Sequence, residues 1–480
     1  MNYRSVAYVL GELFMVVGAL MLLPIAISFY YREGLTIAFL VPAALLLFIG
    51  ILLIARKPKR FNIYTKEGLV ICGLSWIFMS AFGALPFIIS GVIPNYIDAF
   101  FETCSGFSTT GATILTEIQS LPKSVLFWRS FTHWIGGMGI LSFMIAIIPK
   151  SESHSMYIMK AEVPGPKAGK VVSKIQDSAR ILYIIYCALT VIEIIVLYFF
   201  TKMRLFDAVT TAFSTAGTGG FSALNNSIAG YNSSLIEWII IVFMFLFGVN
   251  FNLYFFILIR RFSSAFRNEE LWTYVAVNVA SILLITLSIS NNYDRITDAI
   301  RDAAFNVNSI MTTTGFCTVD FDKWNTFSKV ILVFLMFIGA CVSSTGGGIK
   351  VTRIILYFKE MHADIKRTLK PNAITKIRMN GNAVEKKVIQ GLNSYLVIYL
   401  GILVISTAIV SVNGFDFTST LTSVITCLNN VGPGLGIVGP TGNYASFSVL
   451  SKLVFCFDML AGRLELFPIL ILFVPRTYKK

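Results

Sequence analysis

Charged residues are scarce in this chain: only 13% of its 480 residues are Asp, Glu, Lys or Arg, whereas 56% are hydrophobic. Soluble domains usually contain about 25% charged and about 45–50% apolar residues. This composition excludes an ordinary soluble globular protein. It predicts an all-α polytopic membrane protein, in which many apolar helices cross the bilayer.

Residues that bind metals or carry out covalent catalysis are also few. The only histidines, His133, His154 and His362, are far apart in the sequence and form no HExxH motif. The seven cysteines stand singly, without CxxC spacing, so we expect neither a zinc site nor a disulfide framework. The sequence also offers no nucleophile and base pair that would support an intramembrane hydrolase. We therefore predict no enzymatic activity and no covalent cofactor.

The net charge of +14 reflects an excess of basic residues. Such an excess is compatible with nucleic-acid binding, but in membrane proteins Lys and Arg collect in cytoplasmic loops and fix the orientation. Basic residues gather here in the connections at about 56–66, 150–180, 260–267 and 359–387, and at the C-terminus. These connections all follow returning spans, so we expect them and both termini to be cytoplasmic and expect no nucleic-acid partner.

One short motif recurs four times, each time after about a dozen residues of modest polarity and before a long apolar segment. The copies are FSTTGAT (107–113), AGTGGFS (216–222), MTTTGFC (311–317) and LNNVGPG (428–434). They align without gaps on one glycine each: Gly111, Gly220, Gly315 and Gly432. An aspartate precedes the glycine at one fixed offset in three copies: Asp98, Asp207 and Asp302. The chain therefore repeats one unit four times.

The repeat divides the chain into five parts. We expect two extra N-terminal spans with a basic loop (1–66), then repeat 1 (67–150), repeat 2 (151–265), repeat 3 with a broken second span (266–388) and repeat 4 (389–480). Each repeat holds an outgoing span, a half-length helix, the glycine motif and a returning span, which predicts ten full spans in all. The first span lacks a small-residue cleavage site, so we expect it to be retained.

The half-length helices, such as residues 97–109 and 206–218, rise only ~18 Å and are too short to cross the bilayer. A segment that enters and turns back must be surrounded by protein, because lipid cannot satisfy its open backbone. Asp98 and Asp207 suit the start of such helices as caps and dipole partners. The C-terminal ends would then point inward, so that four negative dipole ends face a shared centre.

The glycine motifs that follow these helices suggest an ion filter. Rings of backbone carbonyls can replace the hydration shell of potassium, and glycine lets the chain adopt the positive φ that turns successive carbonyls to one side. The alternative is that the motifs are flexible extracellular turns. The candidate potassium-binding residues are Thr109, Thr110, Gly111, Thr218, Gly219, Gly220, Thr313, Thr314, Gly315, Asn430, Val431 and Gly432.

Longer motifs resemble the Trk/Ktr/HKT superfamily of potassium uptake proteins, and within it the bacterial membrane subunits of the TrkH/TrkG type. They are HWIGGMGI (133–140), SSTGGGIK (343–350), NNVGPG (429–434) and AGRLELFP (461–468). The resemblance covers essentially the whole chain. It implies four span–pore helix–span units in pseudo-fourfold array, one potassium-selective filter with a glycine from each repeat, and a homodimer. In plant relatives a serine in the first repeat accompanies sodium transport, so Gly111 favours potassium.

The resemblance also implies what the chain does. We expect potassium uptake across the bacterial inner membrane by passive, filter-selected permeation. A cytoplasmic nucleotide-binding regulatory subunit of the RCK type, similar to TrkA, would dock on the basic loops. The alternative is symport, in which sodium or protons move together with potassium.

The third returning span contains a polar interruption with Gly346, Gly347 and Gly348, followed by Lys350. Each glycine costs a helix interior about 1 kcal/mol relative to alanine, so we expect the helix to unwind here. From the residues alone, a plain helix end with Lys350 at the cytoplasmic face is an alternative. The resemblance implies a gating loop beneath the filter. The stretch is not a Walker loop, because Ile349 separates the glycines from the lysine.

Arg463 lies midway along the last span, where a charge costs at least about 2.5–3.5 kcal/mol. Glu465 and Asp458 do not stand at the offsets of three or four residues that share a helical face. Two interpretations remain: a partner on another helix, or a position facing the pore below the filter. The resemblance favours the second, in which Arg463 is an electrostatic barrier to cations.

Five acidic residues are expected near the outer mouth: Asp98, Glu102, Asp207, Asp302 and Asp320. They could concentrate cations there. They could equally cap helices or be solvated.

Overall fold

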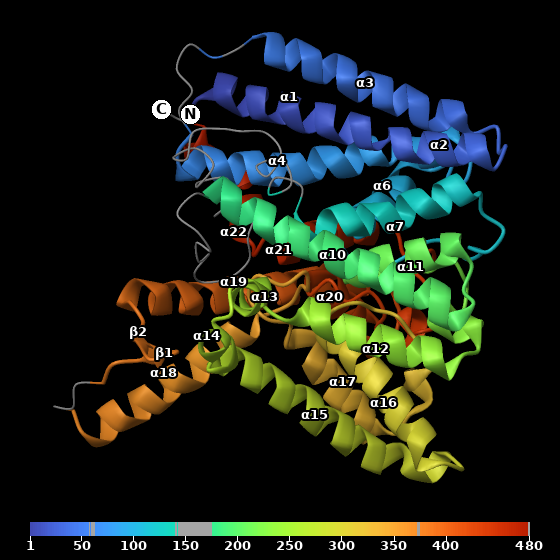
Figure 1. The fold of residues 1–480 in the computed structure, drawn as a ribbon. Helices are drawn as coiled ribbons and strands as arrows, with labels where there is room; N and C mark the ends of the chain where they lie inside the picture. The colour runs from blue at the N-terminus through green and yellow to red at the C-terminus, as the bar shows by residue number, and fades with distance from the viewer. Residues whose placement is uncertain (57, 59–62, 140–141, 143–174, 372–374, 479–480) are drawn as a thin grey trace.

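The computed structural model describes residues 1–56, 58, 63–139, 142, 175–371 and 375–478 (Figure 1). Almost all of the regular structure in these ranges is helical, and a two-stranded antiparallel hairpin joins β1 (Arg378–Met379) to β2 (Asn382–Ala383). This confirms the all-α fold class. His154 lies outside the described ranges, as do several basic residues of the connections predicted to be cytoplasmic and of the C-terminus: Lys57, Lys59, Arg60, Lys150, Lys160, Lys167, Lys170, Lys174, Lys479 and Lys480.

The two extra N-terminal spans form an antiparallel pair at one edge of the molecule. The first is α1 (Tyr3–Leu20), continued by α2 (Leu22–Tyr30), and the second is α3 (Thr36–Ala55). Glycines let their backbones approach: a Cβ on Gly11 would lie 2.8 Å from Leu53 Cβ, and one on Gly50 would lie 2.9 Å from the Gly11 carbonyl. Small residues serve the same purpose in other membrane helix pairs.

The outgoing span of each repeat is a long apolar helix. These helices are α4 (Thr65–Gly83) with its extension α5 (Leu85–Ile89), α10 (Ile175–Thr201), α15 (Glu269–Ile289) and α19 (Lys386–Val410). Together with the N-terminal pair, they make six helices in the described ranges that are long and apolar enough to cross a membrane.

The half-length helices are present in all four repeats, as the sequence predicts. They are α6 (Tyr96–Phe107), α11 (Leu205–Ala216), α16 (Ile296–Met311) and α20 (Phe417–Leu428). We call them the pore helices.

The returning spans differ from the prediction, because none of them is one continuous helix of full length in the described residues. They comprise α7 (Lys123–Met138); α12 (Ser234–Gly248) with α13 (Phe251–Leu258), bent by 90°; α17 (Thr326–Phe337) with α18 (Val351–Leu369); and α21 (Val449–Arg463) with α22 (Phe467–Leu470). The sequence predicted the break in the third returning span but not the interruptions in the others.

Near the ends of α7 and α21, the returning spans pack closely against the pore helices. A Cβ on Gly136 of α7 would lie 1.9 Å from the carbonyl oxygen of Phe107, and one on Gly462 of α21 would lie 1.9 Å from that of Leu428. Phe107 and Leu428 are the last residues of their pore helices. The returning helices therefore need glycine where they touch these ends, and glycine also weakens a helix there.

Shorter elements complete the chain. They are α14 (Phe262–Phe266) and the 3-10 helices η1 (Ser227–Tyr231), η2 (Ser290–Asn292), η3 (Phe321–Lys323), η4 (Ser411–Asn413), η5 (Gly436–Val438), η6 (Ile471–Phe473) and η7 (Pro475–Thr477).

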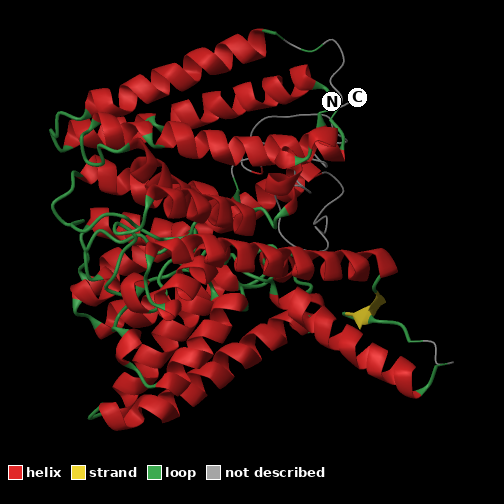
Figure 2. Cartoon of the chain, turned by 180° about the vertical axis from the view of Figure 1, so that it is seen from behind, coloured by secondary structure: helices red, strands yellow, loops and turns green. Residues whose placement is uncertain are grey.

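The beginning and the end of the described chain lie together. The Tyr3 hydroxyl donates to the Tyr478 carbonyl at 2.9 Å, and Lys66 Nζ donates to the Arg476 carbonyl at 3.4 Å. The start of α4 therefore shares one end of the bundle with both ends of the described chain (Figure 1). Figure 2 shows the same bundle from behind, with α18 and the β-hairpin projecting from the body.

Candidate functional site

The pore helices aim their C-terminal ends at the centre of the molecule, but the residues that cap their outer ends are not those predicted. Asn95 caps α6 by accepting from Ile97 N at 2.8 Å, and Asp416 caps α20 by accepting from Ser419 N at 3.0 Å. The hydrogen bonds from Ser419 hold the pKa of the Asp416 carboxyl below its usual value. Asp98 and Asp207 lie in the first turns of α6 and α11 instead. A carboxylate there still interacts favourably with the positive end of the helix dipole.

The residues after each pore helix repeat one backbone conformation. We call residues 109–111, 218–220, 313–315 and 430–432 the filter segments. The first residue of each segment has a positive φ: Thr109 (57°), Thr218 (51°), Thr313 (60°) and Asn430 (57°). The last residue has one too: Gly111 (81°), Gly220 (79°), Gly315 (80°) and Gly432 (92°). A β-branched residue with positive φ is strained, so the surroundings must impose this shape on three threonines.

The filter segments form a closed ring. Each glycine approaches a backbone carbonyl of the next segment so closely that a Cβ would not fit. The distances from such a Cβ to the oxygen are 2.1 Å for Gly111 to Gly219, 2.1 Å for Gly220 to Thr314, 2.3 Å for Gly315 to Val431 and 2.5 Å for Gly432 to Thr110. The contacts run from repeat 1 to 2, 3 and 4 and back to 1. Each carbonyl belongs to the residue before a filter glycine, so equivalent groups meet around the ring.

A cavity of ≈ 90 Å³ lies on one side of this ring and is lined by all four filter glycines. Its walls also include Thr113, Ser222, Cys317 and Pro433, which follow the filter segments in sequence. Each segment therefore leads from the end of its pore helix, through the ring, to this cavity. The cavity is large enough for a small ion with some of its water.

Side chains behind the ring differ between repeats. Hydroxyl pairs brace repeats 1 and 3, with Ser108 Oγ 2.7 Å from Thr110 Oγ1 and Thr312 Oγ1 2.7 Å from Thr314 Oγ1. Repeat 4 uses Asn430, whose Nδ2 donates to Thr110 Oγ1 at 3.1 Å and to the Met459 carbonyl at 2.8 Å. The ring is thus fourfold in its backbone but not in its side chains.

On the side of the ring opposite the cavity lies a loop, residues 338–350, which we call the glycine loop. Its two ends pair: Gly339 N donates to the Ile349 carbonyl at 2.9 Å, and Ile349 N donates to the Phe337 carbonyl at 3.1 Å. The loop therefore leaves and rejoins the span at nearly the same point. This confirms that the third returning span unwinds here.

The glycine loop touches the ends of two pore helices. A Cβ on Gly346 would lie 2.8 Å from the Thr312 carbonyl, and one on Gly347 would lie 2.6 Å from the Asn429 carbonyl. Gly347 N also donates to Thr313 Oγ1 at 2.7 Å. The loop is therefore bonded directly to one filter segment.

Two cationic side chains hold this loop. Lys350 is buried, and its Nζ donates to the Gly346 carbonyl within the loop, so it does not mark a plain helix end at the membrane face. Arg463 donates to the Thr345 carbonyl at 2.5 Å and to the Gly136 carbonyl at 2.7 Å, and also to that of Gly137. The arginine therefore links α21 to the loop and to the end of α7. Within the loop, Gly348 has a φ of 68°, and a Cβ on it would lie only 3.0 Å from Gly339 Cα. Glycine therefore suits this position.

A third anchor of the glycine loop was missed from the sequence. Glu270, at the start of α15, accepts from Val342 N at 2.7 Å and from Thr352 Oγ1 at 2.6 Å. Asn250, at the break between α12 and α13, donates to the same carboxylate at 3.3 Å. Glu270 looks like an ordinary first-turn acid in the sequence, and only its 3% exposure distinguishes it.

A buried ion pair behind the filter was also missed. Arg129 on α7 lies 2.8 Å from Glu102 on α6, and both are almost fully buried. Glu102 also accepts from Thr113 Oγ1 at 2.9 Å. The arginine stacks over the Phe221 ring at 4.1 Å. Glu102 therefore supports the filter and does not concentrate cations at the mouth.

The other acids named for the mouth are mostly paired. Asp98 lies 2.7 Å from Lys452, Asp302 lies 3.3 Å from Arg301, and Asp320 lies 3.3 Å from Lys323. These pairs favour a structural role. Among the described residues, no group of three or more His, Cys, Asp or Glu side chains could hold a metal ion.

Comparison with known proteins identifies the family. Residues 38–478 match the model of the TrkH family, described as cation transport protein. The chain belongs to the TrkH family.

Its relatives are similar over their whole length. The Trk system potassium uptake protein TrkH of Salmonella typhimurium is 36% identical over 487 aligned residues that cover 100% of both chains. The Trk system potassium uptake protein TrkG of Escherichia coli is 30% identical, with 98% of each chain covered. The crystal structure of the potassium transporter TrkH from Vibrio parahaemolyticus matches with a TM-score of 0.89 at 31% identity, over 100% of both chains.

These matches confirm the resemblance drawn from the sequence motifs. Membership of the TrkH family, together with its apolar helices, makes this chain a membrane transport protein and not an enzyme.

Proposed function

We propose that this TrkH family member takes up potassium across the bacterial inner membrane through the ring of filter segments. One observation carries the proposal: four equivalent carbonyl positions surround one axis, each held by a glycine of the neighbouring repeat. Backbone carbonyls so arranged replace the water that a potassium ion loses. The C-terminal ends of four pore helices add partial negative charge around the same axis.

The glycine loop and Arg463 are proposed to control the flow. The loop lies against Thr312, Thr313 and Asn429, on the inner side of the ring. Arg463 places a positive charge beside it, and Lys350 places a second basic group there. In a region shielded from water, such charges raise the energy of a passing cation.

The proposal also assigns an orientation in the membrane and two protein partners. Both termini are cytoplasmic, in line with the shared end of the bundle where Tyr3 meets Tyr478 and with the basic connections. A nucleotide-binding subunit of the RCK type regulates the pore from that side, and the transporter is a homodimer.

Ion flux into proteoliposomes tests the proposal. The native chain should pass potassium in preference to sodium. Gly111→Ser should reduce this preference, because the added Cβ collides with the Gly219 carbonyl. Arg463→Ala should speed potassium flux. A reversal potential that follows potassium alone supports passive permeation, whereas one that also follows sodium or proton gradients supports symport.

If neither ion passes, adding the regulatory subunit distinguishes a closed pore from a wrong assignment. Equal potassium and sodium flux through the open native chain would contradict the filter assignment.

A further inference from the structure

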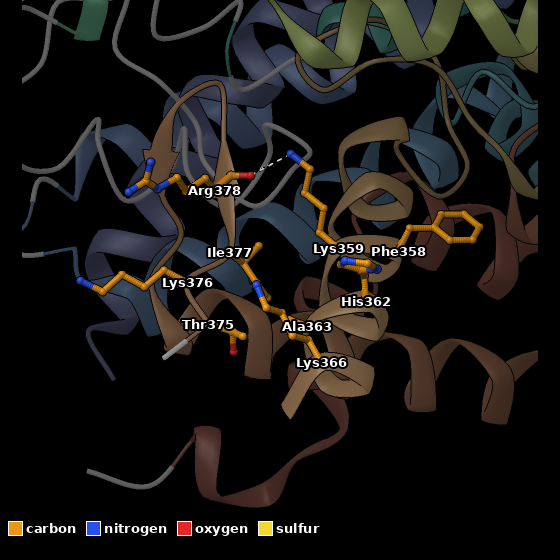
Figure 3. A pocket seen from close by; sticks show the side chains of 9 residues that line it. All are labelled: Phe358, Lys359, His362, Ala363, Lys366, Thr375, Lys376, Ile377 and Arg378. Atoms are coloured by element: carbon orange, nitrogen blue, oxygen red, sulfur yellow. Dashed lines mark hydrogen bonds between the residues drawn. The ribbon is translucent and has the colours of Figure 1, made fainter. Parts of the chain in front are cut away.

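A second cavity lies far from the filter, between α18 and the segment that leads into β1 (Figure 3). Its volume is ≈ 670 Å³. One wall is a face of α18 with Phe358, Lys359, His362 and Lys366, and the other is residues 375–378. We call it the basic pocket.

The lining of the basic pocket is cationic. It contains Lys359, Lys366, Lys376 and Arg378, and no carboxylate. Lys359 is neutralised by Glu269. In the described part of the chain, no acidic side chain pairs with the other three. The pocket therefore has an excess of positive charge that suits an anionic group.

Two hydrogen bonds hold the two walls of the pocket together. Lys359 Nζ donates to the Arg378 carbonyl at 2.8 Å, as the dashed line in Figure 3 shows. Arg367 Nε donates to Thr375 Oγ1 at 2.6 Å. These two bonds hold the segment before β1 against α18. The charged ends of Lys376 and Arg378 point away from α18 in Figure 3, so these long side chains would have to turn inward to contact a ligand in the pocket.

The position of the pocket relative to the membrane can be inferred from contacts between this region and α15. Glu269 is the first residue of that span, and it exchanges two hydrogen bonds of 2.8 Å with Asn380 in the hairpin turn. Trp272, one turn further along, is 56% exposed, as is typical of aromatic residues at the membrane–water interface. Because its lining residue Lys359 pairs with Glu269, the pocket lies beside the start of a helix long and apolar enough to cross a membrane.

An apolar side chain stands at the rim. Phe358 is 63% exposed beside the basic residues, and its ring points away from residues 375–378 in Figure 3. A ligand with a phosphate and an acyl chain would contact both kinds of surface.

We propose that the basic pocket binds the phosphate head group of an anionic phospholipid from the cytoplasmic leaflet. Basic pockets at this level of membrane proteins attract anionic lipids. The basic lining, the exposed Phe358 ring and the contact with the start of α15 together favour a lipid over a soluble anion.

Native mass spectrometry of the full chain in detergent, supplied with phosphatidylglycerol or phosphatidylcholine, tests the proposal. The native chain should retain phosphatidylglycerol in preference to phosphatidylcholine. The triple variant Lys366→Gln, Lys376→Gln, Arg378→Gln should weaken retention about tenfold or more, because three basic contacts are lost. The matched control is Lys370→Gln, Lys386→Gln, Lys387→Gln, which removes the same charge from exposed positions outside the pocket and should retain the lipid normally. Equal thermal unfolding of both variants establishes that they are folded.

Three results would overturn the proposal. Equal loss in the control variant would indicate diffuse attraction and no site. Displacement of phosphatidylglycerol by millimolar inorganic phosphate, with phosphate binding in the absence of lipid, would indicate a free-anion site. Unchanged lipid retention together with lost capture of the regulatory subunit in the pocket variant would assign these residues to a protein interface. None of these readouts depends on ion flux, so they do not test the filter.

Discussion

The two sides of the ring differ in how many repeats contribute to them. On the side of the cavity, all four repeats contribute the same backbone shape, and each filter glycine packs against the neighbouring segment. On the other side, repeat 3 alone contributes the glycine loop, and single residues from other elements hold it: Glu270 from α15 and Arg463 from α21.

Under the proposed function, this difference separates ion selection by the ring from control of flow by the glycine loop. A carbonyl ring needs equal geometry on every side of the ion, so all four repeats are constrained alike. A moving element needs only one hinge and a few anchors, and four identical loops would have to move together. Substitutions on the two sides should therefore have different consequences.

The largest effect is expected from the filter glycines. Gly220→Ala places a Cβ 2.1 Å from the Thr314 carbonyl at a φ of 79°. We expect potassium flux to fall at least about tenfold, since even ~1.4 kcal/mol of distortion along the path gives that factor. Gly315→Ala should behave similarly, because its contact is 2.3 Å. Tracer flux in proteoliposomes measures both.

Gly401→Ala on α19 is the matched control, because nothing lies within 4 Å of the added Cβ. It should leave flux unchanged. Widely different effects at Gly220 and Gly315, with both variants folded, would contradict the equivalence of the four segments.

An intermediate effect is expected from the anchor of the glycine loop. Glu270→Gln weakens two short hydrogen bonds, from Val342 N and Thr352 Oγ1, because charge-assisted bonds are about twice as strong as neutral ones. The loop should leave the filter more often. We expect a few-fold rise in potassium flux and an unchanged potassium-to-sodium ratio.

Glu360→Gln is the control for this acid-to-amide change, since Glu360 lies on α18 and accepts a hydrogen bond from Asn393 Nδ2 at 3.2 Å. It should not alter flux. A changed ion ratio in Glu270→Gln would show that selection and control are not separate.

The smallest effect is expected where the fourth segment departs from the others. Asn430→Thr removes the bonds to Thr110 Oγ1 and to the Met459 carbonyl, each worth about 1 kcal/mol. The temperature of unfolding should fall by a few degrees. Selectivity should persist, because the carbonyl of Val431 is untouched. Loss of selectivity without loss of stability would contradict this assignment.

Local patterns made much of the fold predictable. The start of α6 at Tyr96 and of α11 at Leu205 lie within one residue of the predicted starts. The glycine motifs and the length of the apolar segments are encoded in adjacent residues. The third break was predictable for the same reason, since Gly346, Gly347 and Gly348 are consecutive.

The features that were missed depend on contacts between distant segments. Gly136 and Gly462 look like ordinary glycines of membrane helices, and only their approach to pore-helix carbonyls explains why glycine is needed near the ends of α7 and α21. The roles of Glu270 and Arg129 likewise require knowledge of what lies opposite them. The transport roles of the filter segments and of the glycine loop stay predictions until flux is measured.

The ring also constrains how the protein is made. Its closing contact joins Gly432 to the carbonyl of Thr110, and the neighbouring bond from Asn430 to Thr110 spans 320 residues. A nascent chain that contains only repeats 1 to 3 lacks the fourth filter segment. The closed ring therefore forms only after repeat 4 has been made, and a truncated or unfinished chain cannot reproduce it.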